Sequence, residues 1–167
     1  MIRIANIEDS SRITEIAVFG WRCAYKDFIS LEFLFNELTV KKREERIIES
    51  LLPEKAYGKT YVFEDENIIK GFMTIGKCQD KDKDDQTFEL HRIYIDPIFQ
   101  RQKIGTKLIE YCIEEAYSLK KSEIILWVFE KNHKTINFYM KMGFIKDRTN
   151  KLNEKFSENE IRMVRKL

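Results

Sequence analysis

The stretch from Phe99 to Thr106 constrains the fold of this chain more than any other. It reads Phe-Gln-Arg-Gln-Lys-Ile-Gly-Thr, follows an apolar run at residues 90–95, and precedes an amphipathic pattern that begins at Ile104. This order predicts a strand, a basic turn and a helix. The first amides of a helix lack intrahelical partners and carry the positive end of its dipole. Together with Arg101 and Lys103, they predict a site for a phosphate-bearing cofactor.

Two common phosphate-binding signatures are missing from the sequence. No Gly-x-x-x-x-Gly-Lys-Ser/Thr run occurs, which disfavours a nucleotide triphosphatase. No Gly-x-Gly-x-x-Gly run occurs either, which disfavours a dinucleotide-binding unit. The turn therefore offers one glycine, two cations and a helix N-terminus.

Composition narrows the class of protein. With 167 residues, 43% of them apolar, the chain is expected to form a single globular domain over residues 1–167. The net charge of +2, with acids and bases interspersed, gives no support for nucleic-acid binding. No apolar run approaches the roughly 20 residues of a membrane span, and the N-terminus lacks a signal-peptide core. We therefore expect a cytoplasmic protein without membrane contact.

The cysteines and histidines form no metal-binding pattern, so we expect no metal. These residues are Cys23, Cys78, Cys112, His91 and His133. Cys112 is in line with Ile104, Leu108 and Ala116 at four-residue spacing, which is typical of a buried helix stripe. A Cys–His nucleophile pair remains a weaker alternative.

The order of predicted elements is β, helices, β, β, β, α, β, α, β, β. Strands are expected at residues 2–5, 60–66, 68–75, 88–95, 123–129, 144–149 and 161–165. Helices are expected from a cap at Asp9 or Ser10 to residue 24, within 28–38, after a Thr39 cap to 52, and at 104–119 and 133–142. This order is mixed, and it favours an α/β fold (α+β mixed sheet) in a three-layer α/β/α arrangement.

Three segments resemble motifs of the GCN5-related N-acetyltransferase (GNAT) family. Residues 100–105, Gln-Arg-Gln-Lys-Ile-Gly, resemble its Gln/Arg-x-x-Gly-x-Gly/Ala motif, except that Lys103 stands where the family usually has its first glycine. Residues 89–97 are similar to its fourth strand. Residues 132–144 are similar to its Asn-x-x-Ala-x-x-Phe-Tyr-x-x-x-Gly-Phe segment. The motifs occur in the family's order, and the resemblance covers residues 60–166 well and the first 55 more loosely.

The resemblance implies the acetyltransferase fold, with a central mixed sheet that splays between its fourth and fifth strands to admit acetyl-CoA, the acetyl donor. It implies that the backbone amide of Ile93 binds the oxyanion and that Ile95 pairs with the pantetheine arm. It places the pyrophosphate on the turn formed by Arg101, Gln102, Lys103, Ile104, Gly105 and Thr106. Asn132, a helix N-cap by type and position, would add a polar contact to the cofactor.

Acetyl transfer to an amine needs a base, because an alkyl ammonium has a pKa near 10.4 and its deprotonation at pH 7 costs roughly 4 kcal/mol. The resemblance makes Glu89 the leading base. The two-residue period of a strand places His91 on the same face, so His91 is the alternative base, and water is a third.

Tyr139 matches the family's tyrosine that protonates the departing thiolate, although it also fits a buried helix face with Ile136 and Met140. Residues 21–25 resemble the family's acceptor-side helix, where Tyr25 and Phe28 are the candidates for contact with the acceptor and Trp21 is the candidate for packing. The acidic loop at residues 80–85 is either solvated or attracts a polycation.

The sequence thus predicts an acetyl-CoA-dependent N-acetyltransferase that acts by direct transfer to a primary amine, first a small or polyamine-like one. Protein N-termini or lysines are the second class of acceptor. A non-catalytic acyl-CoA-binding regulatory domain is the rival, supported by the Lys103 departure. A homodimer is among the oligomeric states compatible with the sequence.

Overall fold

The computed structural model describes residues 1–52 and 57–167, and these form two compact units. Unit 1 comprises residues 1–75 and 92–108, and unit 2 comprises residues 76–91 and 109–167. Hydrogen-bonded neighbours in the seven-stranded sheet follow the order β1-β2-β3-β4-β5-β7-β6. The mixed sheet with helices confirms the expected fold class, while the expected single domain stays a prediction.

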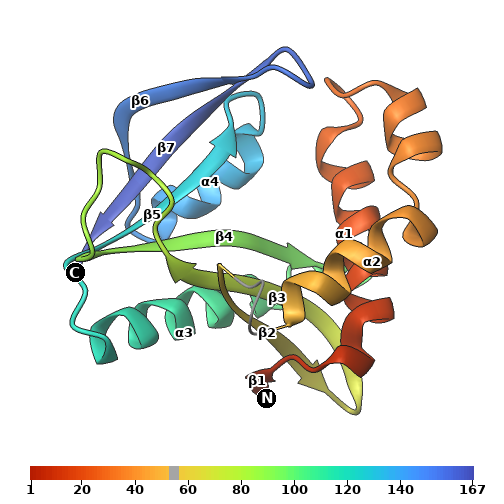
Figure 1. The fold of residues 1–167 in the computed structure, drawn as a ribbon, viewed down its shortest axis with the longest axis horizontal. Helices are drawn as coiled ribbons and strands as arrows, with labels where there is room; N and C mark the ends of the chain where they lie inside the picture. The colour runs from red at the N-terminus through yellow and green to blue at the C-terminus, as the bar shows by residue number, and fades with distance from the viewer. Residues whose placement is uncertain (53–56) are drawn as a thin grey trace. The chain divides into compact units, whose positions relative to one another are not determined.

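Unit 1 contains two helices side by side, α1 (Ser10–Tyr25) and α2 (Val40–Leu51) (Figure 1). Its strands are β1 (Ile2–Ile4), β2 (Gly58–Asp65), most of β3 (Ile68–Lys77) and the second half of β4 (Thr87–Ile95). It also holds a 3-10 turn (Pro97–Phe99) and the first turn of α3 (Ile104–Ser118). A cluster of buried apolar side chains forms its core: Ile13, Ile16, Ile47, Val62, Ile69 and Phe72.

Local signals explain most of the unit 1 boundaries. The Thr39 hydroxyl accepts a hydrogen bond from the Lys42 amide at 3.3 Å, which confirms the expected cap of α2. Glu66 and Asn67 both have positive φ, and this is the geometry of the tight turn expected between β2 and β3. The region expected to hold a second short helix forms a π-helical turn at Phe33–Glu37.

The predicted cap of α1 is right in position, because Asp9 is the N-cap residue, but its side chain makes no capping bond to α1. Its carboxylate instead accepts hydrogen bonds from Arg3 at 2.7 and 2.9 Å. It also accepts from the Asn6 amide at 2.8 Å, as part of a capping box in which Asn6 caps a preceding 3-10 turn (Ile7–Asp9). The carboxylate thus serves the preceding turn, and its ion pair ties the start of α1 to the first strand.

Unit 2 is built around β5 (Glu123–Phe129). The first half of β4 pairs with β5 in parallel at Thr87, Phe88 and Glu89, and β7 (Glu158–Lys166) pairs with β5 antiparallel along its whole length. β6 (Ile145–Asn153) forms a long hairpin with β7, as Figure 1 shows. Both strands are longer than expected, because the polar residues at 150–160 gave no strand signal. The helix α4 (His133–Lys141) ends before Gly143, whose φ is +85°.

Over residues 1–52 and 57–167, the helices are all too short or too polar to cross a membrane.

Candidate active site

In unit 2, Glu89 and His91 form a buried pair at the start of β4. Their shared face, expected from the strand period, brings His91 Nδ1 to 3.2 Å from Glu89 Oε1. The other carboxylate oxygen of Glu89 accepts a hydrogen bond from the Gln79 backbone amide at 2.8 Å. The side chain of Glu89 is 10% exposed and that of His91 is 7% exposed, so both groups are largely removed from solvent.

These contacts keep Glu89 ionised. Burial alone would raise the pKa of Glu89, but the hydrogen bond and charge of His91, followed by the Gln79 amide, outweigh it and lower the pKa. Because the pKa of Glu89 is lowered, its carboxylate is a poorer proton acceptor than an ordinary glutamate. A neutral imidazole that donates from Nδ1 carries its basic lone pair on Nε2, and in His91 this atom is itself buried. In this arrangement Glu89 can orient His91, and an amine that reaches Nε2 could be deprotonated there.

Sequence reasoning missed the arginine that holds the loop before Glu89. Arg162 on β7 is 4% exposed, and its guanidinium donates to Asp80 and to Asp82, each at 2.8 Å. It also donates to Asp147 at 2.7 Å. The Asp80 carboxylate further accepts from the Trp127 indole at 3.2 Å. This network fixes the loop that carries the Gln79 amide, and so it supports the position of Glu89.

Tyr139 and Asn132 lie on and before α4. Tyr139 is buried, with its ring centroid 5.6 Å from that of Phe138 and 5.8 Å from that of Phe144. Asn132 caps the helix as expected, because its side chain accepts a hydrogen bond from the Thr135 amide at 3.3 Å. The roles of Tyr139 as an acid and of Asn132 as a cofactor contact stay predictions.

In unit 1, the basic turn before α3 has the backbone of a glycine-rich turn. Arg101 and Lys103 have φ of 66° and 61°, in the left-handed region that favours glycine. Lys103 thus adopts the conformation that the resemblance assigns to a glycine. The Lys103 carbonyl accepts the first helical bond, from Lys107 at 3.0 Å.

The turn suits a phosphate group. The amides of Ile104, Gly105 and Thr106 precede the first helical hydrogen bond, and an ammonium at position 103 cannot cap them because it has no acceptor. Arg101, Gln102 and Lys103 are exposed, so their side chains are accessible to an anion. The residues present therefore fit the pyrophosphate of acetyl-CoA.

We expect the two roles of Lys103 to separate in variants. Lys103→Gly should relieve the left-handed strain and raise the free energy of unfolding by up to about 1 kcal/mol, the order of the left-handed penalty less the entropy of glycine. Lys103→Glu should weaken acetyl-CoA binding at least tenfold by placing a negative charge at the helix N-terminus. Urea denaturation and calorimetric titration measure these effects. Equal affinity of the wild type and Lys103→Glu would remove the turn from the site.

A buried aspartate and a partly buried arginine hold the end of β4, and sequence reasoning did not predict their pairing. Asp96 is 5% exposed and bonds Arg12 of α1 at 2.5 Å, while its other oxygen accepts from the Ile98 amide at 3.1 Å. Arg12 also donates to the Ile69 carbonyl on β3 at 3.1 Å. Ile93 and Ile95, the residues assigned to the oxyanion and the pantetheine arm, lie half-buried just before this junction. Their backbone roles stay predictions.

Aromatic side chains gather at the C-terminal end of α1. Tyr25 lies edge-on to Trp21 with ring centroids 4.8 Å apart, and Phe28 follows at 5.5 Å from Tyr25. Burial raises the pKa of the Tyr94 phenol on β4. The Tyr94 oxygen also accepts hydrogen bonds from the side chains of Tyr25 and Trp21, which lower that pKa by less than burial raises it. The predicted acceptor-side residues Tyr25 and Phe28 are thus brought together with Trp21.

Two of the three cysteines, Cys78 and Cys112, are poorly suited to act as a thiol nucleophile. Cys112 is 1% exposed, as its stripe position predicted, and burial raises the pKa of its thiol to about 12. Burial also raises the pKa of the Cys78 thiol, and this effect exceeds the lowering caused by the hydrogen bond from the Asp80 amide. A thiolate is therefore disfavoured at both positions.

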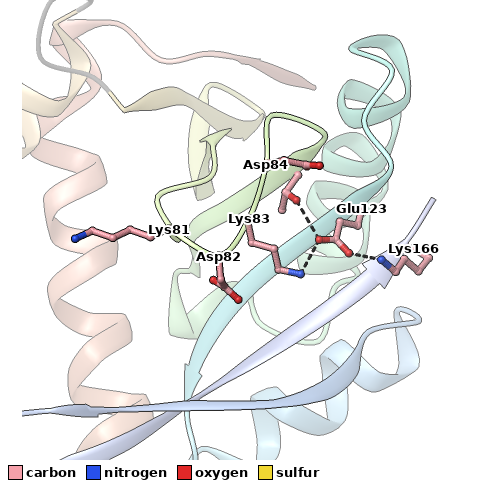
Figure 2. A pocket seen from close by; sticks show the side chains of 7 residues that line it. Lys81, Asp82, Lys83, Asp84, Glu123 and Lys166 are labelled. Atoms are coloured by element: carbon pink, nitrogen blue, oxygen red, sulfur yellow. Dashed lines mark hydrogen bonds and ion pairs between the residues drawn. The ribbon is translucent and has the colours of Figure 1, made fainter.

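Unit 2 also contains a charged cleft of about 480 Å³ that includes none of the predicted site residues. It is lined by Lys81, Asp82, Lys83, Asp84, Thr87, Glu123 and Lys166. Figure 2 shows dashed lines that join Glu123 to Lys83 and to Lys166. The Glu123 carboxylate accepts from Lys83 at 2.7 Å, Thr87 at 3.0 Å and Lys166 at 2.5 Å. This carboxylate and two of the lysines are already paired, which favours a structural role for this cleft.

Glu123 should make stability depend on pH. Burial opposes its ionisation, but bonds from Lys166, Lys83 and Thr87 outweigh burial and lower the pKa to about 2. A carboxyl group whose pKa is lower in the folded state stabilises the fold at every pH above its pKa in the unfolded chain, which is near 4.3. This stabilisation is lost as the pH falls from about 4.3 to about 2. We expect Glu123→Gln to cost on the order of 2 kcal/mol at pH 7, after allowing for solvent screening, and much less at pH 2.5. Urea titrations at both pH values measure the difference, and an equal cost at both would contradict the assignment.

Comparison with known proteins agrees with the fold. Residues 24–144 match the family model described as "Acetyltransferase (GNAT) family". The chain is 28% identical over 139 residues to the N-acetyltransferase YuaI of Bacillus subtilis, covering 83% of this chain and 76% of YuaI. It is 41% identical over 56 residues to the N-acetyltransferase MJ1207 of Methanocaldococcus jannaschii, covering 34% of this chain and only 25% of that protein.

Among solved structures, PaiA N-acetyltransferase from Thermoplasma acidophilum in complex with coenzyme A has the same fold. It superposes with a TM-score of 0.77 at 22% identity, over 100% of this chain and 98% of that one. The fold and the family match define an N-acetyltransferase, a class that uses acetyl-CoA as its donor. The chain belongs to the GNAT family of acetyltransferases.

Proposed function

We propose that this protein transfers the acetyl group of acetyl-CoA directly to a small primary amine. The observation that carries the proposal is the buried Glu89–His91 pair on β4, with 3.2 Å between His91 Nδ1 and Glu89 Oε1. The family match shows the class of reaction but does not identify the residue that accepts the proton of the amine. The Glu89–His91 pair offers such a residue on β4, the strand where the resemblance places the catalytic base.

Each residue has a separate task in the proposed mechanism. Acetyl-CoA supplies an activated acetyl thioester, and the turn amides at 104–106 hold its pyrophosphate. His91 Nε2 takes a proton from the amine, directly or through water, while Glu89 holds the imidazole and balances its positive charge. As the new N–C bond forms and the C–S bond breaks, the Tyr139 hydroxyl gives its proton to the thiolate and recovers one from solvent.

The acidic loop no longer argues for a polyamine. Of its four carboxylates, Asp80 and Asp82 are bonded to Arg162, so much of the loop's charge is neutralised locally. A small acceptor is favoured by the compact packing of Trp21, Tyr25 and Phe28 on one another. The rival of a non-catalytic domain was supported by the lysine at position 103, and Lys103 nevertheless adopts a positive φ, the conformation that favours glycine.

An acceptor screen tests this function. Purified protein is incubated with acetyl-CoA and single amines, and the release of free thiol is followed. The panel includes an amino acid, a polyamine, an N-terminal peptide and a lysine peptide. We expect turnover above the hydrolytic background with one or more small amines, and its loss in His91→Gln. Turnover with peptides alone would shift the acceptor to proteins, and acetyl-CoA binding without any turnover would support the regulatory domain.

A further inference from the structure

Unit 1 contains a half-buried arginine, Arg43, that packs on an aromatic ring. Arg43 of α2 lies with its guanidinium carbon 5.6 Å from the centroid of the Trp21 ring. Among residues 1–52 and 57–167, no Asp or Glu forms an ion pair with it. Arg3 and Arg12, two other partly buried arginines of unit 1, are each paired with a carboxylate. Arg43 differs from these two because it packs on an aromatic ring instead.

The charges around Arg43 have the same sign as its own. Burial is the main cause that lowers the pKa of Arg43, and the positive charges of Arg46 and Arg92 lower it further. The Tyr94 phenol acts in the opposite direction. Placing a guanidinium out of water beside two like charges costs free energy unless an anion compensates it. The site is thus electrostatically prepared for an anion.

The second arginine of this cluster is on the strand. Arg92 donates to the Tyr57 hydroxyl and lies 5.5 Å from the centroid of the Tyr57 ring. The strand period places Arg92 on the same face of β4 as Tyr94, which bonds Tyr25 and Trp21. Gly20 permits this packing, because a Cβ there would lie 2.8 Å from Tyr94 Cδ1. The arginines therefore adjoin the aromatic residues expected to meet the acceptor.

We propose that Arg43, assisted by Arg92, binds a carboxylate on the amine acceptor, so that the preferred substrate is a small amino acid rather than a simple amine or a polyamine. A guanidinium presents two parallel N–H groups that match the two oxygens of a carboxylate. The Trp21 and Tyr25 rings supply apolar surface for the rest of the molecule. This inference rests on the proposed function, because it assumes that the acceptor binds beside α1.

The test uses three amines that differ only at the carboxylate: leucine, leucinamide and isopentylamine. We expect kcat/KM for leucine to exceed that for each of the others by at least tenfold. The ammonium of leucinamide is more acidic than that of leucine, so a larger fraction of leucinamide is neutral and reactive at pH 7. A higher kcat/KM for leucine would therefore appear despite this advantage of leucinamide. Equal rates for the three amines would leave the acetyltransferase function standing and overturn the carboxylate site.

Variants locate the effect. Arg43→Gln should raise KM for leucine about tenfold or more and leave KM for leucinamide unchanged. Arg43→Lys should give an intermediate KM for leucine, because it keeps the positive charge but loses the paired N–H donors of the guanidinium. Lys41→Gln removes an exposed charge of the same helix and should change neither substrate. A loss of acetyl-CoA affinity in Arg43→Gln, with leucine binding intact, would assign the arginine to the donor and overturn the proposal.

Direct binding separates this proposal from the proposed function. Calorimetric titration of the protein with leucine, without a donor, should show binding that Arg43→Gln weakens about tenfold. If no amine is acetylated but leucine binds through Arg43, the function fails and the carboxylate site stands. If amines are acetylated but leucine binding does not depend on Arg43, the site is overturned and the function stands. The wild-type comparison of the three amines decides the matter even if the variants fold poorly.

Discussion

Replacing His91 by glutamine should lower kcat about a hundredfold or more, with little change in the affinity for acetyl-CoA. The reason is that a positioned base contributes about 10²–10⁴ to the rate, and a glutamine can fill the same space but cannot accept the amine proton. The loss should be largest near neutral pH and should shrink at high pH, where more of the acceptor amine is already neutral. Steady-state kinetics across the pH range with the best acceptor measure it.

Glu89→Gln is the matched control for this assignment. Its amide oxygen can still accept from His91 Nδ1, but the negative charge that stabilises an imidazolium is gone. We expect a smaller loss of kcat than in His91→Gln. If Glu89 is the base instead, the order of the two losses reverses. If neither variant differs from the wild type, the base is water and the buried pair is structural.

The sequence was sufficient for the parts of the fold that depend on local pattern. Alternation and helical spacing located β4, α3, β5 and α4, and the Thr39 cap and the turn at Glu66 and Asn67 formed as predicted. These features depend on backbone preferences within a few residues. Asp9 is the N-cap residue as predicted, but its carboxylate binds Arg3, six residues away, and the Asn6 amide of the preceding turn in place of the α1 amides.

The supporting contacts of the site could not be predicted, since they join residues far apart in the chain. Arg162 meets Asp80 across 82 positions, and Arg12 meets Asp96 across 84. An exposed run of acids and a buried ion-pair network look alike in a single sequence. Arg43 is hidden for the same reason: its charge pattern on α2 resembles a solvated helix face, and only packing on Trp21 distinguishes it. The pairing of Glu89 with His91 could be predicted, because the two-residue period of a strand places both side chains on one face of β4.

Arg162→Met should lower the free energy of unfolding by about 3 kcal/mol, the largest stability effect expected of a single polar side chain here. The guanidinium is 4% exposed and meets three carboxylates, of which those of Asp80 and Asp147 are 16% and 19% exposed. Removing one partner from a buried ion pair costs about 3–5 kcal/mol because the remaining charges stay desolvated, and partial exposure places this case at the lower end. Urea denaturation of the purified variant measures the change.

Two further variants distinguish the network from the bulk of the side chain. Arg162→Lys keeps the charge but cannot donate to Asp80, Asp82 and Asp147 at once, so about half of the loss should remain. Asp82→Asn, at a side chain that is 61% exposed, should lower the free energy of unfolding much less than Arg162→Met, because solvent screens this partner. The Arg162 variants should also lower kcat, because the loop that they release carries the Gln79 amide bonded to Glu89. A destabilised Arg162→Met protein that keeps wild-type kcat well below its melting temperature would confine the network to stability and separate it from the Glu89–His91 pair.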